Sequence, residues 1–155
     1  MDQPRKKLLI LEDNEDTLKY VIRELRKVYE VSVALDLTSA CEAVLQAKKH
    51  GQLFDGYIID VGLPVADAPE ELREFIAKLQ PSPISPQNAG QAWARWLRTQ
   101  HKDAKYFYLT ALKEYFVRAN EPESDASTVE VLQKFEDKTS PANIVGTVTQ
   151  IFSPW

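Results

Sequence analysis

The stretch Gly56-Tyr-Ile-Ile-Asp60-Val-Gly62-Leu-Pro64 decides how the chain is interpreted. A run of apolar residues ends in a single carboxylate, and a glycine and a proline follow closely. The pattern predicts a buried strand that ends near Asp60 and brings this carboxylate to its carboxyl edge. Taken alone, it also fits an Asp that only begins a turn, because Asp commonly precedes Gly and Pro in turns. The rest of the chain distinguishes these two interpretations.

Composition predicts one domain over residues 1–155 and no need for a disulfide. The chain has 155 residues, a net charge of −4 and one cysteine, Cys41, which cannot form an intrachain disulfide. We find no secretion signal and no apolar run that would span a membrane, so we expect a soluble cytoplasmic protein. The longest basic cluster is Arg5-Lys6-Lys7, which argues against direct binding of nucleic acid and favours a protein partner.

Strand and helix patterns alternate along the chain. Four further runs have the apolar or β-branched pattern of strands: residues 6–12, 30–36, 105–110 and 128–134. Apolar residues recur at helical spacing over residues 18–28, 38–50, 89–100, 112–119 and 140–151. We expect Asn14 or Asp16 to cap the first of these helices and Thr38 or Ser39 the second. The alternation predicts an α/β fold with a parallel sheet and helices on both faces.

The segment of about residues 65–88 looks like an insertion in this frame. Prolines bracket a short amphipathic helix that is predicted from Glu70 to Gln80. The segment leaves from the carboxyl end of the central strand, so its helix would cover a site there or form a partner surface. The alternative, that it only extends the apolar cover of the sheet, stays open from the sequence.

Polar residues stand at the ends of the predicted strands, where parallel sheets gather their ligands. They are Glu12, Asp13, Asp60, Thr110 and Lys134. Three converging carboxylates repel one another unless a cation compensates, and oxygen ligands favour Mg²⁺. With a metal held there, Asp60 is placed to attack a phosphoryl group, Lys134 offsets charge on the phosphoryl oxygens, and Thr110 donates a hydrogen bond to them.

These residues resemble the receiver domain of two-component response regulators. The similarity lies in Leu-Leu-Ile-Leu-Glu12-Asp13, in Tyr-Ile-Ile-Asp60-Val-Gly62-Leu-Pro64, in Tyr-Leu-Thr110-Ala and in Val-Leu-Gln-Lys134. The motifs occur in the family's order and extend over about residues 6–152. The resemblance implies a flavodoxin-like, doubly wound fold whose five-stranded parallel sheet has the strand order 2-1-3-4-5, with the extra helical insertion as a departure from typical members.

The resemblance also implies a function. Asp60 would accept a phosphoryl group from a phosphohistidine of a sensor histidine kinase or phosphotransfer protein. Glu12, Asp13, Asp60 and the backbone carbonyl of Gly62 would bind Mg²⁺, and Thr110 would switch contacts with a downstream protein whose identity the sequence leaves open. The chain would then be a phosphoacceptor that catalyses only its own phosphorylation and dephosphorylation, rather than an enzyme with other substrates.

Departures from the family keep alternatives open. Phe135 follows Lys134 where the family usually has proline, and Lys138 precedes Pro141 as a rival for the catalytic amine. A pseudo-receiver, an interaction module without regulated phosphorylation, therefore remains a second interpretation. A phosphatase of the haloacid-dehalogenase type is disfavoured, because its nucleophile ends the first strand and is followed two residues later by a second Asp, where this chain has Gly62.

Overall fold

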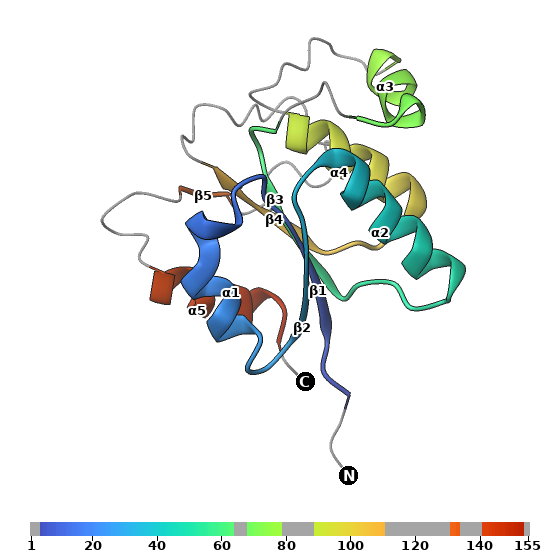
Figure 1. Ribbon diagram of the computed structural model, residues 1–155. Helices are drawn as coiled ribbons and strands as arrows, with labels where there is room; N and C mark the ends of the chain where they lie inside the picture. Colours follow the sequence, from blue (N-terminus) through green and yellow to red (C-terminus); the bar gives the residue numbers. More distant parts are fainter. Residues whose placement is uncertain (1–3, 64–67, 79–88, 111–130, 134–140, 154–155) are drawn as a thin grey trace.

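The computed structural model describes residues 4–63, 68–78, 89–110, 131–133 and 141–153. Five strands form one sheet in the order β2-β1-β3-β4-β5, and every neighbouring pair is parallel (Figure 1). The strands are β1 (Lys7–Leu11), β2 (Glu30–Ala34), β3 (Gly56–Asp60), β4 (Tyr106–Thr110) and β5 (Val131–Gln133). The predicted parallel α/β sheet and its flavodoxin-like strand order are confirmed.

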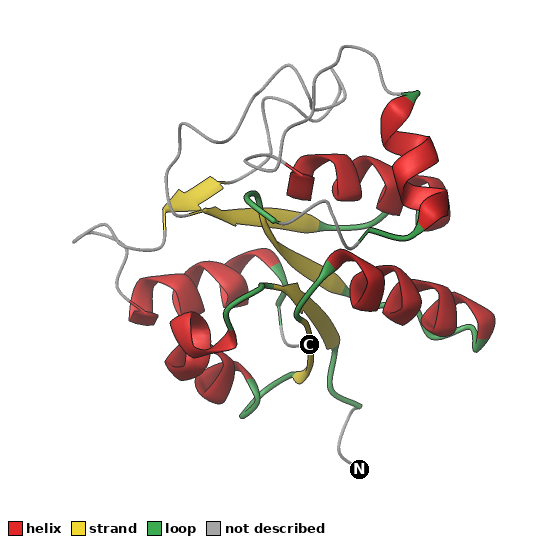
Figure 2. Cartoon of the chain, turned by 45° about the horizontal axis from the view of Figure 1, so that its top comes forward, coloured by secondary structure: helices red, strands yellow, loops and turns green. Residues whose placement is uncertain are grey.

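Helices cover both faces of the sheet, as predicted (Figure 2). They are the 3₁₀ helix η1 (Glu15–Leu18) and the α-helices α1 (Lys19–Leu25), α2 (Leu37–Lys49), α3 (Glu70–Ala77), α4 (Ala89–Gln100) and α5 (Pro141–Ile151). Helices α1 and α5 pack together on one face, while α2 and α4 pack together on the other. Among the described residues, no helix is long and apolar enough to cross a membrane.

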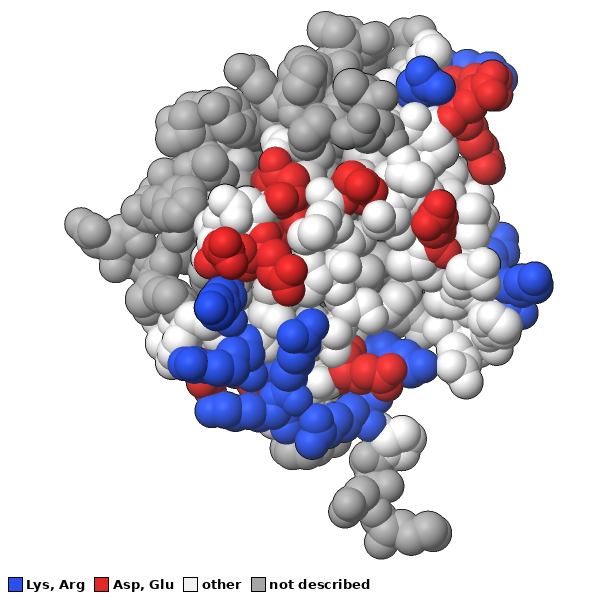
Figure 3. Space-filling model, in the orientation of Figure 1, with Lys and Arg blue, Asp and Glu red and all other residues white. Residues whose placement is uncertain are grey.

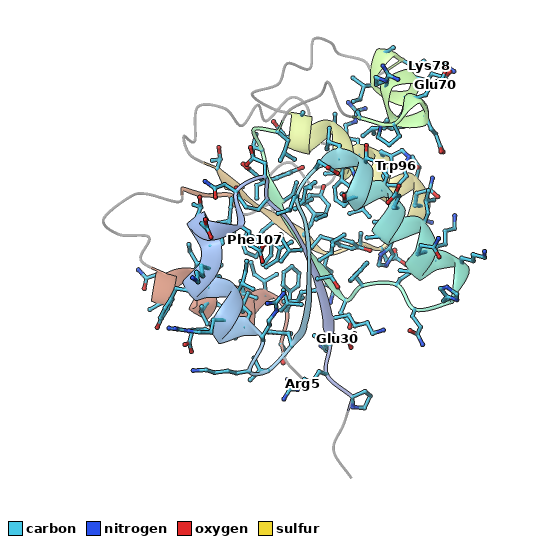
Figure 4. The ribbon with its side chains drawn as sticks, viewed as in Figure 1. Arg5, Glu30, Glu70, Lys78, Trp96 and Phe107 are labelled. Atoms are coloured by element: carbon cyan, nitrogen blue, oxygen red, sulfur yellow. The ribbon has the colours of Figure 1, made fainter. Side chains whose placement is uncertain are left out.

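The central strand β3 is buried along its whole length. Its side chains alternate between the faces: Tyr57 and Ile59 join the core beneath α2 and α4, and Ile58 joins the core beneath α1 and α5. In Figure 4, Trp96 and Phe107 lie on these two opposite sides of the sheet. A strand covered on both faces needs apolar residues at every position, which explains the continuous run that precedes Asp60.

Helix α4 packs its two tryptophans against the sheet. Trp93 is fully buried and Trp96 is 2% exposed. The Trp93 ring lies edge-on to that of Tyr57, with the ring centroids 6.2 Å apart. The helix begins and ends at the predicted residues, Ala89 and Gln100. Burial of this wide aromatic face anchors α4 against β3.

Two helix starts differ from the prediction. Asn14 precedes η1 rather than an α-helix and makes no side-chain capping hydrogen bond. Helix α2 is capped by Asp36, whose Oδ1 accepts a hydrogen bond from the backbone N–H of Ser39 at 2.7 Å, so the prediction of Thr38 or Ser39 as the cap is wrong. The physical reason is that α2 begins at Leu37, which puts the extended Asp36 at the capping position.

The described part of the insertion contains α3, which packs on α4 at one end of the molecule, where Figure 4 labels Glu70 and Lys78. Leu72 is buried, and Phe75 and Ile76 pack partly buried against the core beneath α2 and α4. Helix α3 therefore extends the apolar cover of this face. The helix predicted over residues 112–119 lies outside the described residues.

Candidate functional site

The register between β1 and β3 places the predicted carboxylates side by side. Leu11 pairs with Ile59 in the parallel ladder, so Glu12 and Asp60 are the next residues across from each other. The backbone N–H of Glu12 donates to the carbonyl of Ala34 at 3.0 Å, which holds Glu12 against the end of β2. Two residues that are far apart in the chain thus share the carboxyl edge of the sheet.

Glu12, Asp13 and Asp60 form a compact acidic cluster. Each residue contributes one carboxylate oxygen, and these three oxygens lie within 4.8 Å of one another. Glu12 is 1% exposed and Asp60 is 4% exposed, whereas Asp13 is exposed. Like charges this close raise the free energy of the ionised cluster, and burial of two of them strengthens the effect.

Backbone groups orient the two buried carboxylates. The N–H of Asn14 donates to Oε1 of Glu12 and the N–H of Gly62 donates to Oδ1 of Asp60, each at 3.2 Å. Hydrogen bonds of this kind favour the ionised form of a carboxyl group. These two backbone hydrogen bonds therefore hold the Glu12 and Asp60 carboxylates in fixed positions at the carboxyl edge of the sheet.

The chemistry of this donor set fits a hard divalent cation. All three side chains offer oxygen, and the exposed Asp13 leaves one side of the cluster open to water. Mg²⁺ prefers a few carboxylates together with bound water over a closed protein cage. The acidic cluster can therefore bind a metal such as Mg²⁺. Gly62, the predicted carbonyl ligand, is half-buried two residues beyond Asp60.

Thr110 lies at the same edge of the sheet, on the strand next to β3. Asp60 pairs with Leu109 in the ladder, so Thr110 is one residue beyond this pair, and it is fully buried. Thr110 itself pairs with Gln133 at the end of β5. Lys134, the next residue in the sequence, and its rival Lys138 both lie outside the described residues.

The surface charge is divided on the face that Figure 3 shows. Acidic side chains gather in its upper half, on the side where β1 and β3 end in Figure 1. Lys and Arg side chains gather in the lower part of the same face. Among the described residues, the acidic side chains of this face therefore lie toward the carboxyl edge of the sheet.

Two contacts near β3 were not predicted from the sequence. The backbone N–H of Gly90, at the start of α4, donates to the carbonyl of Val61 at 2.8 Å. At the opposite end of β3, the hydroxyl of Tyr57 lies 3.0 Å from Nδ1 of His101. Burial lowers the pKa of His101, although Asp103 and Asp55 oppose the shift. A glycine inside a helical pattern was the only local signal for the first contact.

Comparisons with known proteins locate the fold. A scan against protein-family models found no match, and a search of curated proteins also found none. Solved structures do match over nearly the whole chain. The non-phosphorylated HemR receiver domain from Leptospira biflexa matches with a TM-score of 0.63 and 17% identity, covering 96% of this chain and 94% of its own.

Two other structures match at similar levels. The chemotaxis protein CheY4 of Vibrio cholerae has a TM-score of 0.57 and 21% identity, covering 94% of this chain and 98% of its own. A CheY-like response regulator receiver domain protein from Methanospirillum hungatei has a TM-score of 0.59 and 14% identity, covering 94% and 91%. The chain therefore has the fold of CheY-like response regulator receiver domains.

Proposed function

We propose that the chain is a phosphoacceptor of a two-component system or phosphorelay, and that Asp60 carries the phosphoryl group. The observation that carries the proposal is the acidic cluster at the carboxyl edge, with the nearly buried Asp60 within 4.8 Å of Glu12 and Asp13. The shared fold adds support, because the matching structures include several that are described as response regulator receivers.

The proposed step is a direct transfer from a phosphohistidine. A carboxylate oxygen of Asp60 attacks phosphorus, an O–P bond forms, the N–P bond to the imidazole breaks, and the released ring nitrogen takes a proton from water. Bound Mg²⁺, held by Glu12, Asp13, Asp60 and the carbonyl of Gly62, would neutralise negative charge on the phosphoryl oxygens. The Gly62 N–H orients the attacking carboxylate through its bond to Oδ1.

The neighbouring strands supply the other proposed roles. Thr110 is buried one residue beyond the Asp60–Leu109 pair. In the proposed mechanism its hydroxyl donates a hydrogen bond to the phosphorylated carboxylate of Asp60, and this movement alters the shape of the protein surface near β4. Lys134 offsets charge on the phosphoryl oxygens, with Lys138 as the rival for this role. A downstream protein reads the change only if it binds the two states with different affinity.

Intact-protein mass spectrometry tests the proposal. The protein is incubated with acetyl phosphate and Mg²⁺, and we expect the added mass of one phosphoryl group on the wild type and none on Asp60→Asn. Asp16→Asn is a matched control, because Asp16 is an exposed acid of η1 outside the cluster. This variant should be labelled like the wild type, and a chelator should abolish labelling in both.

The other interpretations make different predictions for the same assay. A wild type that stays unlabelled while folded would contradict the proposal and favour a pseudo-receiver. Sustained hydrolysis of a generic phosphomonoester would favour a phosphatase. Comparing Lys134→Ala with Lys138→Ala identifies the amine, because only loss of the phosphate-contacting lysine should slow labelling strongly.

A further inference from the structure

We propose that Gly90 is a positioning residue for Asp60, and that α4 holds the acidic cluster in its metal-binding geometry through this glycine. The inference deepens the proposed function, on which its metal-binding part rests. It concerns a residue that lies far from Asp60 in the chain and bears no functional group of its own.

The first turn of α4 lies directly against the backbone that carries Asp60. The N–H of Gly90 donates to the carbonyl of Val61 at 2.8 Å. A Cβ atom built on Gly90 would lie 1.9 Å from the carbonyl oxygen of Asp60, 2.8 Å from its carbonyl carbon and 2.9 Å from Cα of Val61. All three are backbone atoms, so no side chain can rotate away to make room. Only glycine allows this approach.

Both partners of the contact are fixed. On the strand side, the N–H of Val61 donates to the carbonyl of Leu109 at 3.1 Å, which ties the segment to β4. On the helix side, Ala89, Ala92 and Trp93 are fully buried. Because neither side can yield locally, a larger residue at position 90 would force either the Asp60–Gly62 segment or helix α4 to shift.

A shift of the Asp60–Gly62 segment would change the geometry of the acidic cluster. The peptide that Gly90 contacts joins Asp60 to Val61, and Gly62 follows with the N–H that orients the Asp60 carboxylate. Glu12 and Asp13, the other members of the cluster, follow β1, which is a different strand from the one that Gly90 contacts. Packing of α4 on the Asp60–Val61 peptide therefore sets the distance between the two sides of the metal site.

The chain offers a matched pair of helical glycines for the test. Gly146 lies in α5, and a Cβ built there has no atom within 4 Å. We compare Gly90→Ala with Gly146→Ala by titrating full-length protein with Mg²⁺ alone in a calorimeter, with circular dichroism to show that each variant is folded. Gly90→Ala should weaken Mg²⁺ binding by about tenfold or more, as removal of a group that orients a metal ligand typically does. Gly146→Ala should bind as the wild type does. A folded Gly90→Ala with wild-type affinity would overturn the proposal.

A measurement without metal separates this proposal from the proposed function. In metal-free protein, the amide signals of Asp60, Val61 and Gly62 and the carboxyl carbon signal of Asp60 should shift in Gly90→Ala and stay in place in Gly146→Ala. Unchanged signals would refute the positioning role even if the wild type is phosphorylated. Shifted signals would support it even if the wild type binds no Mg²⁺, a result that counts against the proposed function alone.

If Gly90→Ala does not fold, hydrogen exchange of the wild-type protein tests the proposal instead. Mg²⁺ should slow hydrogen exchange of the Gly90 N–H, because it tightens the segment that this N–H contacts, and should leave the Gly146 N–H unaffected. Equal exchange at Gly90 with and without bound Mg²⁺ would refute the coupling between α4 and the site.

Discussion

Glu12 and Asp60 should repel each other measurably when no metal is bound. Their carboxylate oxygens approach within 4.8 Å, and the residues are only 1% and 4% exposed. A double-mutant cycle of Glu12→Gln, Asp60→Asn and the double variant isolates this pair, because contacts that either residue makes elsewhere cancel. The unfolded chain gives little repulsion, since the two residues are then far apart.

Coulomb's law sets the expected size of the coupling. Two unit charges at 4.8 Å repel by about 0.9 kcal/mol at the dielectric constant of water and by about 3.5 kcal/mol at an effective value of 20. Burial of both side chains favours the upper part of this range, and the open side at Asp13 favours the lower. We therefore expect a non-additivity of about 1 to 3 kcal/mol in metal-free buffer.

The assay is urea unfolding of all four proteins at pH 7, followed by circular dichroism, with chelator and again with saturating Mg²⁺. Without metal, the double variant should gain less stability than the two single variants gain in sum, because each single variant already removes the same repulsion. With Mg²⁺, the coupling should shrink or change sign, since both carboxylates then hold the cation.

Additive effects in metal-free buffer would refute the reasoning, because they would mean that the two carboxylates do not interact as charges. Glu12→Gln combined with Glu74→Gln is the control pair. Glu74 is an exposed acid of α3 outside the cluster. The two changes should be additive within about 0.5 kcal/mol.

Three further predictions follow from single contacts. Asp36→Ala should lower the free energy of unfolding in urea by about 1 kcal/mol, because it removes the cap of α2. Ser39→Ala keeps the backbone N–H that Asp36 accepts from, so it should cost less than about 0.5 kcal/mol. Equal losses in the two variants would contradict the assignment of the cap. Burial lowers the pKa of His101 in the folded state, so the unfolded state binds the imidazole proton more readily. The free energy of unfolding should therefore fall as the pH drops below about 6.5 and level off below the folded-state pKa. His101→Gln should weaken this pH dependence, and an unchanged profile in the variant would contradict the prediction. Burial raises the pKa of the Cys41 thiol to about 12, so a thiol reagent at pH 8 should label native protein slowly and urea-unfolded protein fast; equally fast labelling would show that Cys41 is accessible.

Local sequence patterns predicted the elements of this fold well. The apolar run before Asp60 predicted a strand buried on both faces, and β3 is buried at every position. Helix α4 has the predicted bounds, and α5 (Pro141–Ile151) lies where the spacing of apolar residues over 140–151 predicts a helix. These features depend on hydrophobic periodicity and on residues such as proline that act on their immediate neighbours, so a single stretch contains enough information.

The residue that caps a helix was harder to predict, because it depends on the exact position at which the helix begins. Asp36, rather than Thr38 or Ser39, caps α2 because the helix starts at Leu37. All three residue types are good caps, so composition does not choose among them.

The sequence by itself determined that Asp60 ends a buried strand and that other acids end a neighbouring one. Only the tertiary structure decided that Glu12 stands across from Asp60 in the ladder, that the acidic oxygens lie within 4.8 Å, and that Gly90 rests on the Asp60–Val61 peptide. The physical reason is that side-chain patterns specify where a strand or helix forms, whereas the distances within the site depend on how β1, β3 and α4 pack. That packing joins residues far apart in the chain, and no local stretch encodes it.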